Sequence, residues 1–229
     1  MKVAVYTCIT GNRCPLQTQQ RYEGADFLFF TDTPVENVGG WQPVYLPITN
    51  DSARRRAKGP KILAHQYLQN YYLQNYDYSL WIDGNCSLLL PITDLLTYLD
   101  NAEIALFRSP LGDCVYEHAT LCREGNFDDD VGAFVLSAQV QRYKEMGFPA
   151  HAGFYEGGVI LRRHSERVRQ WENIWWEEVR TGSVRDQISL PFALRQAEIT
   201  PAILPGTIRN DILKGSIFFD YKVSPPPKR

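Results

Sequence analysis

Short apolar runs that alternate with helix-like segments are the feature of this sequence that most constrains its fold. Runs at Val3–Cys8, Asp26–Thr31 and Tyr78–Ile82 have the length of buried strands, and polar or glycine-containing turns follow them. Strands that alternate with helices along a chain pack as a mainly parallel sheet with helices on both faces. We therefore expect the α/β class, with one mixed, mainly parallel sheet in a single domain over residues 1–229 and a frayed tail at 224–229.

The remaining elements follow from the same patterns. Pro60 is expected at the first turn of a helix that runs to about Tyr72, because a missing N–H costs nothing there. In a later helix, Asp186 is expected in the first turn, where a carboxylate meets the positive end of the helix dipole. Further strands are expected at 41–46, 88–90, 103–107 and 157–162, and helices at 92–99, 116–146 with a break near 125–130, 166–180 and 186–196.

The composition limits the class of protein. With 44% hydrophobic and 22% charged residues, the chain is globular rather than disordered. The net charge of −2 gives no reason to expect a nucleic-acid partner, and the chain lacks the run of about 18 apolar residues that predicts a transmembrane segment. The five cysteines form no CxxC pair and the chain opens on a strand-like run, so we expect a cytoplasmic protein with free thiols. Cys114, His118 and Cys122 share one helical face, but a zinc site there would lack a fourth ligand.

The central candidate for chemistry is Asp83-Gly84-Asn85, which follows the strand at 78–82. In open α/β folds, ligands bind at the carboxyl ends of the strands, so Asp83 is placed at that edge. Gly84 permits a sharp turn or a close approach of backbone to ligand. Asn85 adds a neutral oxygen that could orient a metal-bound water or a ribose hydroxyl. An ordinary Asp-Gly turn has the same sequence.

A basic run precedes this strand: five cations lie within eight residues, among them Arg56, Lys58 and Lys61. Pyrophosphate binds to cations and to the N–H groups of a helix start, which a helix beginning at Pro60 would supply. The same helix would place Lys61 and His65 one turn apart on one face. A solvated charged surface explains the run equally well.

Two later segments could position a sugar. In the first, Glu156 precedes Gly157 and Gly158, so an acid able to bind hydroxyls or act as a base stands beside backbone that a ligand can approach. In the second, Asp186 and Gln187 offer an acceptor and an amide to hydroxyl groups. The alternatives are an exposed Glu in a turn and a purely structural acid at a helix start.

Taken in order, these segments resemble a glycosyltransferase-like family with bacterial and plant Golgi members, long catalogued as a domain of unknown function. The resemblance covers nearly the whole chain, and WIDGN followed about a hundred residues later by RDQ is its most specific part. It is carried by VYTCITGN, DFLFFTD, ARRRAKGPKILAH, YSLWIDGN, NAEIALFRSP, EGGVILRRH and GSVRDQISLPFAL.

More broadly, the chain is similar to glycogenin-like transferases, which implies a Rossmann-like GT-A fold and a nucleotide-sugar donor, with UDP-sugars expected first. By this resemblance, Asp83 and Asn85 take the positions of a DxD motif that holds Mn²⁺ or Mg²⁺ or the donor ribose. On the nucleotide side, the resemblance places Thr7 and the basic residues Arg56, Lys58 and Lys61. It assigns Gly84 to the donor site, Glu156, Gly157 and Gly158 to the acceptor-side strand, and Asp186 and Gln187 to the transferred sugar.

Two departures from that pattern weaken the metal expectation. Asn85 replaces a carboxylate, although Mn²⁺ and Mg²⁺ prefer anionic oxygens. Related transferases often supply a late histidine, whereas the last histidine here is His164, and Asp211 or Asp220 would have to substitute.

We therefore expect a bacterial, cytoplasmic glycosyltransferase that moves a sugar from a nucleotide donor to a carbohydrate or other hydroxyl acceptor. The resemblance implies retention of configuration; inversion would instead favour Asp186 or Glu156 as a base. Two alternatives stay open: a nucleotide-sugar-binding protein without transferase activity, and a hydrolase with Asp83 and Asp186 as paired carboxylates.

Overall fold

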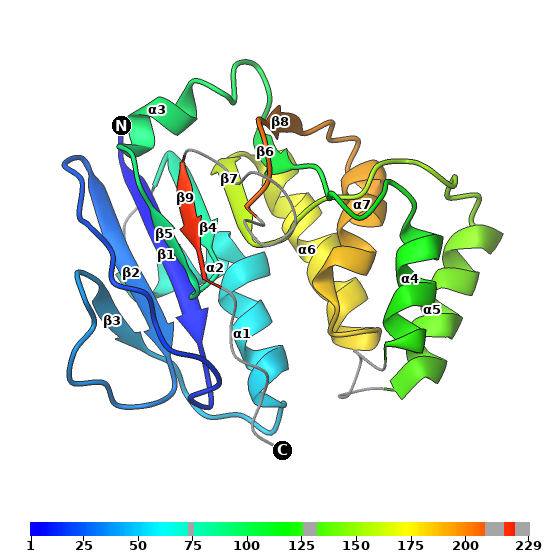
Figure 1. The fold of residues 1–229 in the computed structure, drawn as a ribbon, viewed down its shortest axis with the longest axis horizontal. Coiled ribbons are helices and arrows are strands. Elements are labelled where there is room, and N and C mark those ends of the chain that lie inside the picture. The colour runs from blue at the N-terminus through cyan, green and yellow to red at the C-terminus, as the bar shows by residue number, and fades with distance from the viewer. Residues whose placement is uncertain (73–75, 126–131, 209–217, 223–229) are drawn as a thin grey trace.

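The structure is a computed structural model that describes residues 1–72, 76–125, 132–208 and 218–222. Its centre is a seven-stranded sheet with the strand order β3-β2-β1-β4-β7-β6-β8 (Figure 1). The strands are β1 (Val3–Ile9), β2 (Ala25–Thr31), β3 (Gln42–Tyr45), β4 (Tyr78–Ile82), β6 (Ile104–Phe107), β7 (Val159–Arg163) and β8 (Ala202–Leu204).

The described strands pair mostly in parallel. β7 alone runs antiparallel to both of its neighbours, β4 and β6, and the other four ladders of this sheet are parallel. All seven residues of β1 are buried, as both faces of a central strand are covered. The predicted mixed, mainly parallel sheet is confirmed.

Helices α1 (Ala53–Ile62), α2 (Ala64–Tyr72), α6 (Glu166–Thr181) and α7 (Asp186–Gln196) pack on one face of the sheet. Alternate strand side chains point to this layer, including Tyr6 and Ile160, and they meet Trp171 and Trp175 of α6. The two indole rings stack with centroids 5.0 Å apart, as residues four positions apart on a helix can do.

The other face carries the short helix α3 (Ile92–Leu96) and a two-stranded sheet of β5 (Cys86–Leu88) and β9 (Phe219–Tyr221). Side chains at Val5, Phe29 and Leu80 point to this layer, one residue out of step with those that face the four helices. Both faces therefore carry helix, but on this side it is a single described helix of five residues.

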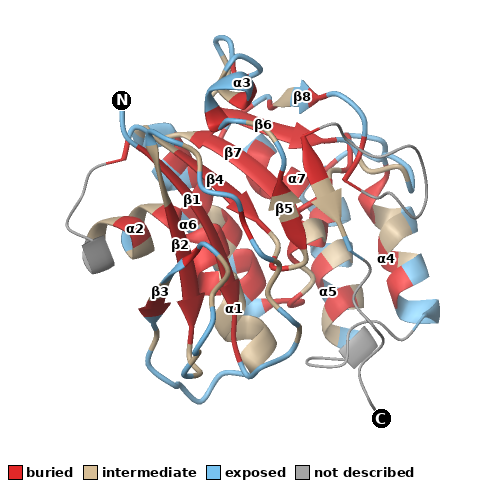
Figure 2. Ribbon diagram, turned by 60° about the vertical axis from the view of Figure 1, so that its left-hand side comes forward, coloured by how far each residue is buried: buried red, intermediate tan, exposed pale blue. Residues whose placement is uncertain are grey.

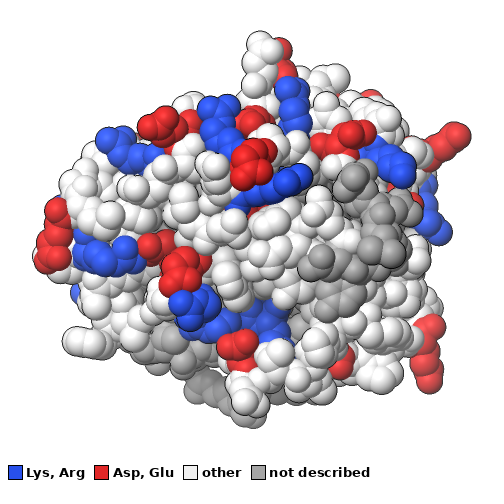
Figure 3. All heavy atoms as spheres, turned by 180° about the vertical axis from the view of Figure 1, so that it is seen from behind, with Lys and Arg blue, Asp and Glu red and all other residues white. Residues whose placement is uncertain are grey.

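A third apolar cluster joins α4 (Val115–Glu124) and α5 (Gly132–Glu145) to α7, at the end of the molecule opposite β3 (Figure 1). The central strands are buried, whereas α4 exposes part of its surface (Figure 2). Acidic and basic side chains lie next to one another on the face drawn in Figure 3. In the described part of the chain, no helix is both long and apolar enough to cross a bilayer.

The predicted helix start at Pro60 is wrong. α1 begins at Ala53, where the hydroxyl of Ser52 accepts a hydrogen bond from the Arg55 N–H at 3.2 Å, and Pro60 lies inside the helix. A serine cap supplies the acceptor that a first turn needs, and this decides the start. Because α1 ends at Ile62 and α2 begins at Ala64, Lys61 and His65 lie on different helices.

Most other predicted elements lie within a few residues of the observed ones. The helix at 186–196 has the predicted bounds, and Asp186 stands in its first turn as expected. The strand expected at 88–90 lies at Cys86–Leu88, and β8 and β9 were not predicted. The tail at 224–229 lies outside the described residues, and the single domain stays a prediction.

A buried ion pair ties the helical layer to the sheet. The side chains of Arg162 in β7 and Glu172 in α6 are both 0% exposed, with Nε and Oε1 3.1 Å apart. Arg162 also donates to the Tyr6 hydroxyl at 2.8 Å and to the Lys61 carbonyl at 2.7 Å. Glu172 accepts from the backbone N–H of His65 at 3.0 Å. The pair thus holds both sides of the α1–α2 break.

We expect Glu172→Ala to lower the free energy of unfolding by about 3–5 kcal/mol, because it leaves a buried guanidinium without its counter-charge. Chemical denaturation measures the loss. Glu177→Ala on the exposed side of the same helix is the control and should leave the stability unchanged. Equal stabilities for the two variants would contradict a stabilising role for the Arg162–Glu172 pair. The double change Arg162→Met with Glu172→Leu should restore most of the free energy of unfolding, because it leaves no unpaired buried charge.

Candidate functional site

A cavity of about 200 Å³ lies at the carboxyl end of β4 and is called here the central cavity. Eight of the predicted site residues line it: Lys58, Lys61, Asp83, Glu156, Gly157, Gly158, Asp186 and Gln187. Its other lining residues are Arg54, Arg185, Ile208 and Tyr221. Four basic and three acidic side chains therefore face one small space.

A second cavity of about 220 Å³, the side cavity, shares Lys58, Lys61 and Asp83 with the central one. Its remaining wall consists of Cys8, Cys14, Ala57, Trp81, Gly84 and Asn85. Burial raises the pKa of the Cys8 and Cys14 thiols, and nearby carboxylates raise it further, so both thiols are neutral at physiological pH. The two lysines and Asp83 stand where the cavities meet.

Asp186 is held between two lysines at this junction. Its Oδ1 lies 2.8 Å from Nζ of Lys58 and its Oδ2 lies 2.5 Å from Nζ of Lys61. The three side chains are between 4% and 18% exposed, so the charges interact with little screening by water. α1 supplies both lysines, three residues apart on one face, and the first turn of α7 supplies the carboxylate.

The protonation of this group follows from its burial and its charges. Burial alone would raise the pKa of Asp186, but attraction to Lys58 and Lys61 outweighs it and the pKa is lowered. Burial alone would lower the pKa of Lys61, but Asp186 and Asp83 raise it. The pKa of Lys58 is lowered, first by burial and also by repulsion from Lys61. Asp186 is thus ionised at neutral pH and poorly suited to accept a proton.

Asp83 turns partly toward solvent, with its side chain 42% exposed. Its Oδ1 accepts from the indole N–H of Trp81 at 2.9 Å and lies 3.6 Å from Nζ of Lys61. Its backbone N–H donates to the Gly158 carbonyl at 2.8 Å, which joins the ends of β4 and β7. The sequence therefore placed Asp83 correctly at the end of its strand.

Neighbouring side chains pack closely against the glycines of the site. A Cβ on Gly157 would lie 3.1 Å from Nζ of Lys61 and 3.4 Å from Oδ2 of Asp186. On Gly158 it would lie 2.3 Å from the Ile208 side chain, and on Gly84 it would lie 2.5 Å from the Ile9 side chain. Packing against Lys61, Ile208 and Ile9 therefore requires these positions to lack a Cβ.

Glu156 and Gln187 lie on the wall away from the side cavity. The Glu156 carboxylate accepts from the Thr207 hydroxyl at 2.8 Å and from the Ile208 N–H at 3.0 Å, and the residue is 5% exposed. Gln187 donates through Nε2 to the Tyr155 carbonyl at 3.0 Å, which leaves its amide oxygen able to accept from a sugar hydroxyl. Thr207 and Ile208 therefore hold the Glu156 carboxylate in place.

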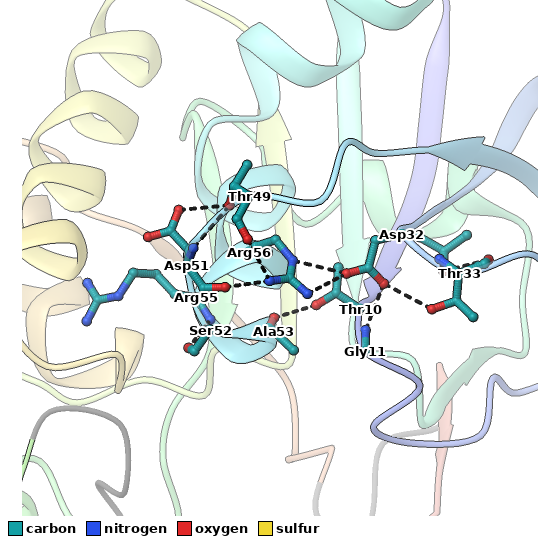
Figure 4. A network of polar contacts seen from close by, with 11 residues as sticks. Thr10, Gly11, Asp32, Thr33, Thr49, Asp51, Ser52, Ala53, Arg55 and Arg56 are labelled. Carbon is teal, nitrogen blue, oxygen red and sulfur yellow. Dashed lines mark hydrogen bonds and ion pairs between the residues drawn. The ribbon is translucent and has the colours of Figure 1, made fainter.

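Two predicted donor-site residues lie elsewhere. Arg56 points away from both cavities and forms a salt bridge to Asp32, with NH2 and Oδ2 2.8 Å apart, while the Gly11 N–H donates to the same carboxylate (Figure 4). Thr7 is fully buried beneath Gly84, and its hydroxyl has no hydrogen-bond partner among the described residues.

A divalent metal ion at Asp83 and Asn85 would find a poor set of ligands. The amide nitrogen of Asn85 donates to the carbonyl of Lys222 at 3.0 Å, so the residue that follows β9 holds this side chain. Asp83 already has the Lys61 ammonium beside it, and Mg²⁺ and Mn²⁺ prefer several anionic oxygens. The metal at these residues stays a prediction.

The two acids considered as substitutes for a late histidine are Asp211 and Asp220. Asp220 lies in β9 opposite Ser87, and Asp211 lies outside the described residues. Within the described ranges, the group with metal-like spacing is Cys114, Glu117 and His151, whose ligand atoms lie within 4.8 Å of one another. It contains neither Asp83 nor Asn85, and it is not the Cys114–His118–Cys122 set considered from the sequence.

Sequence reasoning missed Ile208 and Tyr221 as cavity residues. Both belong to late segments that tertiary packing brings to the site: Ile208 donates its N–H to Glu156, and Tyr221 pairs with Cys86 across the small sheet. No local motif marks either residue. Arg54 and Arg185 were visible only as members of the basic run and of the RDQ segment.

We expect Asp186→Asn to lower the free energy of unfolding at pH 7 by about 3–5 kcal/mol, because two ammonium groups lose their buried partner. A carboxyl whose pKa is lowered by folding stabilises the protein fully above its unfolded pKa of about 3.9 and loses that contribution as the pH falls below it. The gap between wild type and variant should therefore be constant from about pH 7 to 5 and narrow below about pH 4. Urea denaturation across this range measures it, with the exposed Asp94→Asn as control. A gap that does not narrow would contradict the assignment.

Comparison with known proteins places this geometry in a family. Residues 20–210 match the TOD1/MUCI70 glycosyltransferase-like domain. An Arabidopsis thaliana protein named "Probable hexosyltransferase MUCI70" is 30% identical over an alignment of 167 residues, and the match covers 67% of this chain and 27% of that protein. This chain thus spans about a quarter of that relative's length. A solved structure of the bifunctional glycosyltransferase WbbM in its apo form is similar over 89% of this chain and 39% of that one, with 11% identity and a TM-score of 0.49.

The match confirms the resemblance that the sequence motifs indicated. It spans most of the 229 residues and contains Lys58, Asp83 and Asp186, which meet in the central cavity. The chain belongs to the family of TOD1/MUCI70 glycosyltransferase-like domains.

Proposed function

We propose that this protein transfers a hexosyl group from a nucleoside diphosphate sugar to a hydroxyl acceptor. The observation that carries the proposal is the buried Lys58–Asp186–Lys61 group at the junction of two cavities. Membership of a glycosyltransferase-like family and a relative named as a probable hexosyltransferase support it. UDP-hexoses are the first donors to test, and the cytoplasmic, bacterial setting stays a prediction.

The shared wall of the two cavities suggests how the donor lies. The diphosphate is placed beside Lys58 and Lys61, because these two buried cations lie where the central cavity meets the side cavity. The nucleoside occupies the side cavity, next to Trp81 and Asn85. The sugar occupies the central cavity, which Gly157 and Gly158 line.

In the reaction, the bond between the anomeric carbon and the phosphate oxygen breaks, and its electron pair leaves with the diphosphate. Lys58 and Lys61 neutralise that growing charge in a site with little water, where fixed charges have their largest effect. Asp186 keeps the two ammonium groups together before the donor binds. The lysines therefore take the role that the resemblance assigns to a metal ion.

The acceptor oxygen forms the new bond to the anomeric carbon and gives up its proton. Of the three acids that line the central cavity, Asp83 and Asp186 have Lys61 beside them. The Glu156 carboxylate has instead the Thr207 hydroxyl and the Ile208 N–H as its donors. We assign the proton-accepting role to Glu156, so the proposal is direct displacement with inversion rather than the retention that the resemblance implies, and we assign the binding of sugar hydroxyls to Gln187.

We expect UDP-hexose to stabilise the wild-type protein equally in EDTA and in Mn²⁺, by about 2.7 kcal/mol at a hundred times its dissociation constant. Lys61→Met and Lys58→Met should each weaken binding at least tenfold, because each removes a cation from the diphosphate. Thermal unfolding of ligand-free and ligand-bound protein measures both effects. Lys144→Met, a change of an α5 lysine outside the cavities, is the control. Binding that requires Mn²⁺ and survives both lysine changes would overturn this role.

We expect Glu156→Gln to reduce kcat for transfer by about 10²–10⁴-fold while the dissociation constant of the donor stays within a few-fold of wild type. Product analysis by mass spectrometry, with and without an acceptor, measures transfer and donor hydrolysis separately. Sugar released to water at the same rate with and without an acceptor would instead favour the hydrolase alternative.

A further inference from the structure

A third cavity, of about 470 Å³, opens beside the central one and is called here the α4 cavity. It shares Glu156, Arg185 and Gln187 with the central cavity, so the two meet at the wall where the proposed chemistry takes place. α4 contributes His118, Leu121 and Cys122, and the segment after β6 contributes Ser109, Pro110 and Leu111. The volume is within the range of sites that bind small molecules.

The wall away from this junction includes three aliphatic side chains, those of Pro110, Leu111 and Leu121. Leu111 and Leu121 are 48% and 49% exposed, so two leucines lie open to solvent at one cavity. No Trp, Tyr or Phe is among its described lining residues, and those are the side chains on which sugar rings usually stack. Such a wall gains most from contact with an alkyl or aryl group, because burial of apolar surface is its main source of binding energy.

His118 adds a polar group to the wall of the α4 cavity. Its ring packs on Phe154 with centroids 4.3 Å apart, and its Nδ1 is buried without a hydrogen-bond partner among the described residues. Burial, with a contribution from Arg185, lowers the pKa of His118 to about 4, so the ring is neutral at pH 7. A neutral ring with an unmet polar atom suits an uncharged ligand that carries a hydroxyl.

We propose that the α4 cavity is the acceptor subsite and that Leu111 and Leu121 select glycosides with an alkyl or aryl aglycone. The reacting hydroxyl then lies at the wall formed by Glu156, Arg185 and Gln187, and the aglycone lies along α4 and the segment at 109–111. The inference rests on the proposed transferase function, because only transfer needs an acceptor next to the donor sugar.

The test compares hexyl and phenyl β-glycosides of glucose and galactose with the matching methyl glycosides, as acceptors for whichever UDP-hexose binds. We expect hexyl or phenyl glycosides to be used with at least tenfold higher kcat/KM than the methyl glycosides. Leu121→Ser and Leu111→Ser should remove that advantage through KM, with the KM of the donor unchanged. Leu89→Ser is the matched control, since Leu89 is also 48% exposed and lines none of these cavities.

The outcomes separate this inference from the function on which it rests. Transfer to methyl glycosides as efficient as to hexyl and phenyl glycosides, or equal effects of Leu121→Ser and Leu89→Ser, would overturn the inference and leave the transferase function standing. If no nucleotide sugar binds, the proposed function fails, and saturation-transfer NMR with hexyl β-glucoside decides whether the cavity binds an apolar aglycone. Signal that Leu121→Ser abolishes and Leu89→Ser keeps supports the subsite; no signal in wild type overturns it.

Discussion

The site depends on a buried ion pair that does not touch it. Arg162 and Glu172 take two opposite charges out of water, and such a pair is tolerable only if its remaining polar atoms are bonded. Some of those bonds go to the backbone on both sides of the break between α1 and α2. The backbone carbonyl of Lys61 is therefore fixed to the centre of the sheet. The ammonium group of the same residue extends toward Asp186 and Asp83.

Under the proposed function, the central cavity is preorganised to bind the diphosphate of the donor. Two ammonium groups kept close together would repel each other, and Asp186 compensates for that repulsion in the free protein. In the proposed reaction, the diphosphate would meet cations that are already oriented, so little reorganisation would be needed when charge moves onto the leaving group. The missing side chains at Gly157 and Gly158 belong to the same design, since a Cβ at either position would press on groups of the site.

Local patterns predicted the strands from β1 to β7, the position of Asp83 and the first turn of α7, because apolar periodicity and strand-end carboxylates are short-range signals. The start of α1 was missed because the preference of Pro60 for a first turn was outweighed by the cap at Ser52. The position of Arg56 was beyond local reasoning, since its partner Asp32 lies in another segment of the chain. The tie between Glu156 and Thr207 likewise forms only when distant segments pack together.

The turn at Asn85 has a consequence for how the molecule is made. Its side chain and its carbonyl bond to the backbone of Lys222, 137 residues later, and β9 closes over β5 beside it. A nascent chain can assemble most of the central sheet well before that partner has been synthesised. The turn that carries Asp83 is bonded to Gln17 and Gly158 as well, but its bonds to Lys222 form only when one of the last described residues arrives. Donor binding should therefore be acquired late in synthesis, and a chain broken off before β9 would retain much of the sheet but not a finished site.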